Sequence, residues 1–183
     1  EAYNKNINQF VFFSCTIMYP SRDKPHNEYS FKYSDPIKQN YFAGAWTKLY
    51  LEKMAEFYAG LGRTRYNIVR HSNIYGPHDK FDLQQSHVFG ATISKVLMAE
   101  DKVTVWGSGD EKRDLLYVDD LVDFVIAAIE LQQTSFELYC CGTGEPISIT
   151  DLTRLIIENA NRPLGIQYDR EKPTIPTNIS VDC

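Results

Sequence analysis

The chain has 183 residues, of which 43% are hydrophobic and 23% charged, and its formal net charge is −5. This apolar content is sufficient for one sizeable core, so we expect one domain or a piece of one. The negative charge leaves no broad basic face for nucleic acid, and the apolar runs are too short to cross a membrane. The first residues do not resemble a signal peptide, and we expect a cytoplasmic protein.

The first part of the chain contains two strand-like runs separated by a helical pattern. Residues Gln9 to Ser14 are apolar without alternation, which is typical of a strand covered on both faces. Residues Ala45 to Tyr58 place large apolar side chains at helical spacing, and Gly60 and Gly62 mark the end of that helix. Residues Tyr66 to Arg70 form the next predicted strand.

The second part continues this alternation of strands and helices. A turn is predicted over Asn73–Pro77, helices over Val88–Ala99, Val118–Leu131 and about Thr150–Asn161, and strands over Lys102–Trp106 and Glu137–Cys141. Thr150 is a candidate cap for the last helix, while Asp119 and Asp120 stand where a helix dipole favours acids. The alternation predicts an α/β fold with a parallel sheet flanked by helices. The adjacent Cys140 and Cys141 are expected to be buried packing residues.

A glycine-rich phosphate-binding turn of the dinucleotide type is absent from the sequence. A complete doubly wound nucleotide-binding fold places that turn after its first strand. We therefore expect residues 1–183 to be the carboxyl-side part of one larger domain, with the first βαβ units, about a hundred residues, lying upstream.

Three motifs in this order resemble the extended short-chain dehydrogenase/reductase family, the NAD-dependent epimerases/dehydratases. They are Ser14–Pro20, Arg70–Pro77, and Trp106–Asp114 followed by Tyr117–Asp120. Within the family they look most like the GDP-L-fucose synthases. The resemblance implies a Rossmann-type doubly wound sheet, NADP or NAD as cofactor, and a nucleotide-sugar substrate bound by segments at about 78–114 and 142–183. It also implies a homodimer formed through the helix at Ala45–Tyr58, with a place in the intramolecular core as the alternative for its large apolar side chains.

The resemblance implies that Lys48 holds the nicotinamide ribose and lowers the pKa of a tyrosine four residues earlier, which moves the hydroxyl proton. The chain has Gly44 at that position. Tyr41 and Tyr50 project from other sides of a helix, so neither is a ready replacement. Loss of a general acid/base lowers a rate by about 10²–10⁴-fold. Two hypotheses therefore stand: a nucleotide-sugar epimerase or reductase, and a catalytically impaired protein that binds nucleotide-sugar or dinucleotide.

Further catalytic residues implied by the resemblance are Cys15, Thr16 and His87. Cys15 stands where the family has serine or threonine, and its alternative role is burial as an apolar residue. His87 has an ordinary pKa of about 6.5, which suits proton transfer near neutral pH, and its alternative role is structural. The cofactor site implied by the family contains Ser14, Cys15, Lys48, His71, Ser72, Asn73, Ile74 and His87.

Substrate-binding residues implied by the resemblance are Asn73, Lys95, Trp106 and Arg113. Trp106 would stack on the nucleotide and Arg113 would make a forked contact with phosphate, with simple solvation as the alternative for Arg113. For Asn73 the alternative is a role in the following turn. Lys95 stands in place of a family arginine and Thr174 in place of an acid, which leaves the sugar nucleotide open. The histidines lack metal-like spacing, and we expect no metal site.

Overall fold

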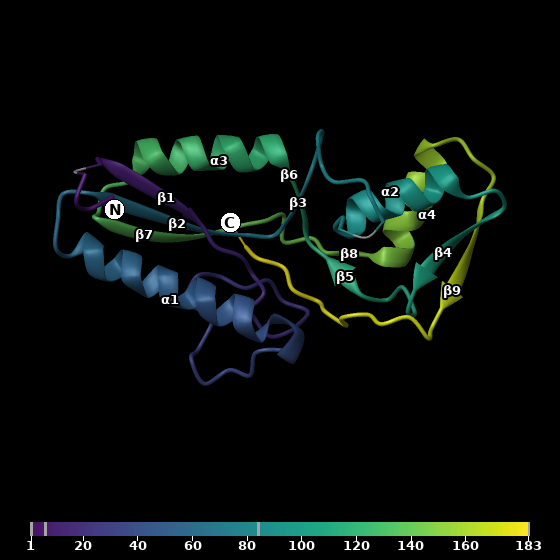
Figure 1. Cartoon of the computed structure of the whole chain (residues 1–183), viewed down its shortest axis with the longest axis horizontal. Coiled ribbons are helices and arrows are strands. Elements are labelled where there is room, and N and C mark those ends of the chain that lie inside the picture. Colours follow the sequence, from purple (N-terminus) through teal and green to yellow (C-terminus); the bar gives the residue numbers. More distant parts are fainter. Residues whose placement is uncertain (1, 6, 84, 183) are drawn as a thin grey trace. The chain divides into compact units, whose positions relative to one another are not determined.

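The computed structural model describes residues 2–5, 7–83 and 85–182. The chain divides into two compact units (Figure 1). Unit 1 comprises Glu1–Ile74, Asp114–Glu145 and Ile179–Cys183, and unit 2 comprises Tyr75–Arg113 and Pro146–Asn178. The chain therefore leaves unit 1 twice, builds one segment of unit 2 each time, and returns twice.

Unit 1 is built on a parallel sheet with the strand order β1-β2-β7. The strands are β1 (Gln9–Phe13), β2 (Arg65–His71) and β7 (Phe136–Cys141). Helices α1 (Phe42–Ala59) and α3 (Val118–Leu131) cover opposite faces of this sheet (Figure 1). Five successive residues of the central strand β2 are buried, as expected for a strand covered on both faces, and they include the polar Asn67 and Arg70. The predicted Rossmann-type α/β fold is confirmed.

The two faces of the sheet carry separate clusters of apolar side chains. Ile68 packs with Ala55 and Ala59 of α1, whereas its neighbour Val69 packs with Leu121 of α3. Successive residues of a strand point to opposite faces, so one strand supplies both clusters. Cys140 and Cys141 follow the same rule, being 1% and 2% exposed on opposite sides, as predicted. Cys183 lies outside the described residues.

Short elements join the sheet to the rest of unit 1. A 3-10 turn, η1 (Gln39–Tyr41), precedes α1, and β3 (Asn73–Tyr75) pairs with β6 (Leu115–Tyr117). The prediction of a turn beginning at Asn73 is therefore wrong for its first residues. The Asn73 N–H donates to the carbonyl of Asp114 at 3.0 Å, and this bond to a distant segment extends the backbone.

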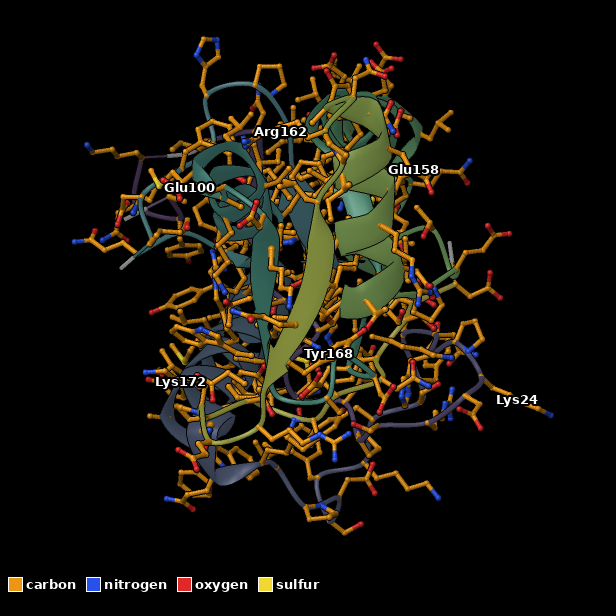
Figure 2. All side chains as sticks on the ribbon, turned by 90° about the vertical axis from the view of Figure 1, so that its right-hand side faces the viewer. Lys24, Glu100, Glu158, Arg162, Tyr168 and Lys172 are labelled. Carbon is orange, nitrogen blue, oxygen red and sulfur yellow. The ribbon has the colours of Figure 1, made fainter. Side chains whose placement is uncertain are left out.

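Unit 2 combines two helices with a two-stranded parallel sheet, in which β4 (Lys102–Trp106) pairs with β9 (Gly165–Asp169). The helices are α2 (Val88–Met98) and α4 (Ile149–Asn159), and two short strands distant in sequence, β5 (Lys112–Arg113) and β8 (Ile147–Ser148), pair antiparallel. Val96, Val103 and Ile157 form the core of the unit. Figure 2 shows α4 beside these strands, with Tyr168 on β9.

The start of α4 differs from its prediction. The helix begins at Ile149, and the Ser148 hydroxyl accepts the N–H of Asp151 at 3.0 Å. Ser148 is therefore the cap, and Thr150 lies within the first turn, where its hydroxyl is 3.2 Å from the Tyr168 hydroxyl. Both residues have suitable side chains, and only the onset of helical backbone distinguishes them. A search of the described residues finds no helix with the length and apolarity required to span a bilayer.

Candidate functional site

The carboxyl end of β1 is tied to α1 by a buried hydrogen bond. Ser14 follows β1 directly, and its N–H extends the strand by donating to the Val69 carbonyl at 2.8 Å. Its hydroxyl donates to Glu52 Oε1 at 2.5 Å, and both side chains are buried. The Ser14 hydroxyl therefore faces into the unit, where it holds the strand end against the helix.

Glu52 also forms a buried, forked ion pair with Arg70 of β2. The Arg70 Nε and Nη2 atoms lie 3.0 and 2.5 Å from the two carboxylate oxygens, and Nη1 donates to the Tyr19 hydroxyl at 2.9 Å. Burial acts to lower the pKa of Arg70, but its bonds to Glu52 and Tyr19 raise it above the ordinary value. The pair joins α1 to β2 directly behind the sheet edge. We did not predict it, although a glutamate on the buried face of α1 was a visible signal.

Lys48 stands one turn before Glu52 and points to the same sheet edge. Its Nζ donates to the Phe13 carbonyl at 2.6 Å and lies 4.8 Å from the centre of the Phe12 ring. The half-buried ammonium group is thus held at the carboxyl end of β1, where ligands bind in open α/β sheets. This position fits a lysine that holds a nicotinamide ribose.

The helix position four residues before Lys48 is exposed and carries Gly44. A Cβ atom added to Gly44 would find its nearest neighbour, Ile17 Cδ1, at 3.3 Å. Tyr41 lies at the cap before α1, and Tyr50 on the helix is 63% exposed. Neither has the spacing from Lys48 that the family tyrosine has.

Cys15 and Thr16 follow Ser14 at this edge. Burial raises the pKa of the Cys15 thiol, and the nearby Lys48 charge only partly opposes this effect. The thiolate that a base requires is therefore disfavoured. Thr16 is buried, and its carbonyl accepts the Tyr19 N–H at 3.0 Å in a tight turn. Catalytic roles for Cys15 and Thr16 stay predictions.

His71 ends β2 and is close to the β1 edge. Its ring centre is 6.2 Å from that of Phe13, and its Nδ1 lies 2.7 Å from the Ser72 carbonyl. Burial lowers the pKa of His71, and the positive charge of Lys48 lowers it further. The Ser72 Oγ is buried without a hydrogen-bond partner among residues 2–5, 7–83 and 85–182. The structure therefore groups Ser14, Cys15, Lys48 and His71 at one sheet edge.

Asn73 is anchored by a buried acid. Its backbone N–H and its Nδ2 both donate to the Asp114 carbonyl, at 3.0 and 3.1 Å. The Asp114 carboxylate accepts the Thr143 N–H at 2.9 Å and the Val181 N–H at 3.1 Å. The predicted residue Ile74 is half-buried against the α3 side of the sheet. Asp114 thus fixes Asn73, a structural contribution that we did not predict.

Unit 2 brings three predicted substrate residues together in one cavity of about 510 Å³. Lys95 of α2, Trp106 of β4 and Arg113 of β5 all line it. The Lys95 Nζ lies 4.6 Å from the centre of the indole ring, and burial lowers the pKa of this lysine. Within the described part of the chain, Lys95 has no hydrogen-bond or ion-pair partner. A half-buried cation of this kind is well suited to an anionic ligand.

Arg113 is held at the cavity wall by the segment that follows β9. Its guanidinium donates to the Thr177 hydroxyl, and Nη2 lies 3.4 Å from the Ile175 carbonyl. Trp106 is 44% exposed, so part of its ring is available to a ligand. The cavity therefore combines a flat aromatic surface with two cations.

His87 is exposed at the residue before α2. Its neighbours Ser86 and Val88 line the cavity in unit 2. A role for His87 in proton transfer stays a prediction. No group of three or more potential metal ligands was found among the residues that the structure describes.

Sequence comparison gives nucleotide-sugar enzymes at modest identity. The chain is 27% identical over 184 residues to GDP-L-fucose synthase of Escherichia coli, covering 94% of this chain and 57% of that protein. It is 31% identical over 105 residues to GDP-L-colitose synthase of Yersinia pseudotuberculosis, covering 55% of this chain and 34% of that protein. The chain thus spans little more than half the length of the curated relatives that it matches almost throughout.

Solved structures agree on the fold. A GDP-L-fucose synthetase from Naegleria fowleri superposes with a TM-score of 0.83 at 20% identity, covering 98% of this chain and 58% of that one. UDP-glucose 4-epimerase of Thermotoga maritima superposes with a TM-score of 0.82 at 22% identity, covering 99% of this chain and 56% of that one. The family model "NAD dependent epimerase/dehydratase family" matches residues 1–142. The chain has a Rossmann-type sheet, and Lys48 of α1 reaches the carboxyl end of β1. With the family model matching residues 1–142, the chain therefore belongs to the NAD-dependent epimerase/dehydratase family.

Proposed function

We propose that the protein is an NAD(P)-dependent nucleotide-sugar reductase or epimerase of the GDP-L-fucose synthase type. The observation that carries this proposal is the cavity in unit 2, where Lys95 is half-buried beside Trp106 and Arg113. Lys95 has no ion-pair partner among the described residues, and a half-buried cation without such a partner favours a ligand that supplies negative charge. A sugar nucleotide offers both a diphosphate for the cations and a flat base for the indole.

The proposed cofactor site lies at the carboxyl end of β1 in unit 1. NADP or NAD, when bound, donates or accepts a hydride, and the GDP-L-fucose synthetase of Naegleria fowleri, which has the same fold, has been solved with NADP bound. Lys48 would hold the nicotinamide ribose, because its ammonium group is already fixed at the Phe13 carbonyl. His71, Ser72, Asn73 and Ile74 would contribute backbone and polar contacts along the same edge.

Proton transfer is the step that Gly44 puts in question. Glycine has no side-chain proton to donate, so His87, Thr16 or Cys15 would have to donate and accept protons in a working enzyme. The second candidate is a protein that binds the same ligands but has impaired turnover, and Gly44 is the observation that favours it. The two candidates share their binding sites and differ only in rate.

We also propose that the protein forms a homodimer through α1. Phe42, Tyr50 and Phe57 of this helix are 50, 63 and 59% exposed, which is unusual for large apolar side chains on a helix of a monomer. Light scattering on the full-length protein would measure the mass. Substitution of Phe57 and Tyr50 by glutamate would yield a monomer under this proposal, whereas an unchanged mass would contradict it.

Ligand binding and turnover separate the candidates. The full-length protein would be titrated by calorimetry with GDP-, UDP-, dTDP- and CDP-linked sugars, and oxidation of NADPH or NADH would then be followed by absorbance. We expect Lys95→Gln to weaken nucleotide-sugar binding by at least about tenfold, because a charge-assisted contact is lost. Lys102→Gln removes an exposed lysine nearby and is the matched control. Absence of binding across the panel would contradict both candidates, and binding without turnover would favour the second.

A further inference from the structure

The cavity in unit 2 contains polar atoms that its own residues leave unsatisfied. Glu111 Oε2 and Ser86 Oγ are buried and have no hydrogen-bond partner in residues 2–5, 7–83 and 85–182, and both residues line the cavity. Buried carboxylate oxygens in folded proteins are nearly always hydrogen-bonded, because an unmet acceptor costs free energy. A ligand in this cavity would therefore be expected to bring hydrogen-bond donors as well as negative charge.

The fold places the Glu111 carboxylate against Gly107, the residue that follows Trp106. Gly107, which follows Trp106, has a φ of +76°, and a Cβ there would lie 2.9 Å from Glu111 Oε1 and 2.6 Å from Thr174 Cγ2. The carboxylate thus passes directly over the Gly107 backbone. The Glu111 carbonyl accepts the Ile149 N–H at 2.9 Å, which holds this loop against the start of α4. Thr174, where the family resemblance predicts an acid, approaches the same point, so Glu111 brings a carboxylate to that neighbourhood.

A carboxylate can only accept hydrogen bonds, and this restricts the base that it can contact. Guanine presents two adjacent N–H donors, on its ring nitrogen and its amino group, that match two carboxylate oxygens. Uracil and thymine present one N–H between two carbonyl oxygens, which a carboxylate repels. Cytosine and adenine place a ring-nitrogen acceptor beside their amino group. Only guanine therefore satisfies both oxygens from one edge.

We propose that Glu111 selects guanine, and thus a GDP-linked sugar, by accepting the two N–H groups of a base stacked on Trp106. This inference rests on the proposed function, since it requires a nucleotide in the cavity. Glu111 is a specificity-determining residue in this scheme and takes no part in hydride or proton transfer. The orphaned Ser86 hydroxyl, on the same cavity wall, is available for a further polar contact with the nucleotide.

The test compares bases that differ in the N–H donors they present. The full-length protein would be titrated by calorimetry with GDP, with inosine diphosphate, which lacks the amino group, and with UDP. We expect GDP to bind at least about tenfold more tightly than either of the others, because each lacks a donor for the carboxylate. In Glu111→Gln the amide replaces one acceptor by a donor. The affinity for GDP should then fall by about tenfold or more, and GDP should no longer bind more tightly than inosine diphosphate. The affinity for UDP should equal or exceed that of the wild type.

Controls separate failure of this inference from failure of the proposed function. Glu100→Gln, at an exposed acid of unit 2 labelled in Figure 2, should leave all three affinities unchanged. Equal binding of GDP, inosine diphosphate and UDP by the wild type would overturn the role of Glu111 and leave the nucleotide site intact. Equal weakening of all three in Glu111→Gln would assign the carboxylate to the ribose and also overturn it. Absence of nucleotide binding by a folded wild-type protein would overturn both proposals.

Discussion

Gly44→Tyr tests whether the missing phenol limits turnover. Residue 44 lies one turn before Lys48 on α1, and residues four apart share a helix face. A new Cβ would meet Ile17 Cδ1 at 3.3 Å, and this atom is the flexible end of a side chain that can move by a few tenths of an ångström. Because position 44 is exposed, the phenol can extend beside the Lys48 ammonium group without displacing backbone.

Two effects of known size follow from this substitution. A correctly placed general acid/base raises a rate by about 10²–10⁴-fold. Replacing glycine inside a helix by tyrosine also stabilises the folded state by roughly 0.5 kcal/mol, because the unfolded chain has less backbone freedom to lose. The positive charge of Lys48 should lower the pKa of the new phenol, so the gain in rate should begin below the ordinary tyrosine pKa of about 10.

The assay is steady-state oxidation of NAD(P)H with the nucleotide-sugar that binds most tightly in the panel. Gly44→Phe is the matched control, since it changes the helix and the Ile17 contact in the same way but has no hydroxyl. We expect a large rate increase for tyrosine alone, and its loss when Lys48→Met is added. Equal rates for the tyrosine and phenylalanine variants, both shown to be folded by circular dichroism, would refute the reasoning.

Three further predictions concern stability, measured as the free energy of unfolding in urea. Arg70→Leu leaves Glu52 charged and buried, so we expect the free energy of unfolding to fall by about 3–5 kcal/mol. Replacing both Arg70 and Glu52 by leucine should restore most of that stability, and a double variant as unstable as the single one would contradict the pairing. Ser148→Ala should cost about 1 kcal/mol through loss of the α4 cap, and an unchanged value would show that the cap is dispensable. Burial lowers the pKa of His26 and His71, so the unfolded chain takes up their protons more readily and stability should fall as pH drops below about 6.5. His26→Phe should flatten this pH dependence, and an unaltered slope would exclude His26 as a source.

Local patterns in the sequence were sufficient for main elements of both units. The predicted bounds of α3, Val118–Leu131, and of β4, Lys102–Trp106, agree with the structure, because the periodicity of apolar residues reports which faces of an element are buried. The order of three short motifs was sufficient to indicate the family, and the resemblance then pointed to Lys48, whose role stays a prediction. These features depend on residues that are neighbours along the chain.

Tertiary structure alone decided the contacts between distant segments. The pairing of Asn73–Tyr75 with β6, the ion pair of Glu52 with Arg70 and the anchoring of Asn73 by Asp114 join residues on different elements, and no local period encodes such partners. Lys95, Trp106 and Arg113 were each predicted from motifs, but their meeting in one cavity arises from the packing of α2, β4 and β5. Glu111 was overlooked for the same reason: a charged loop residue is ordinarily solvated, and only the fold buries one of its oxygens and brings the residue to the cavity that Trp106 also lines.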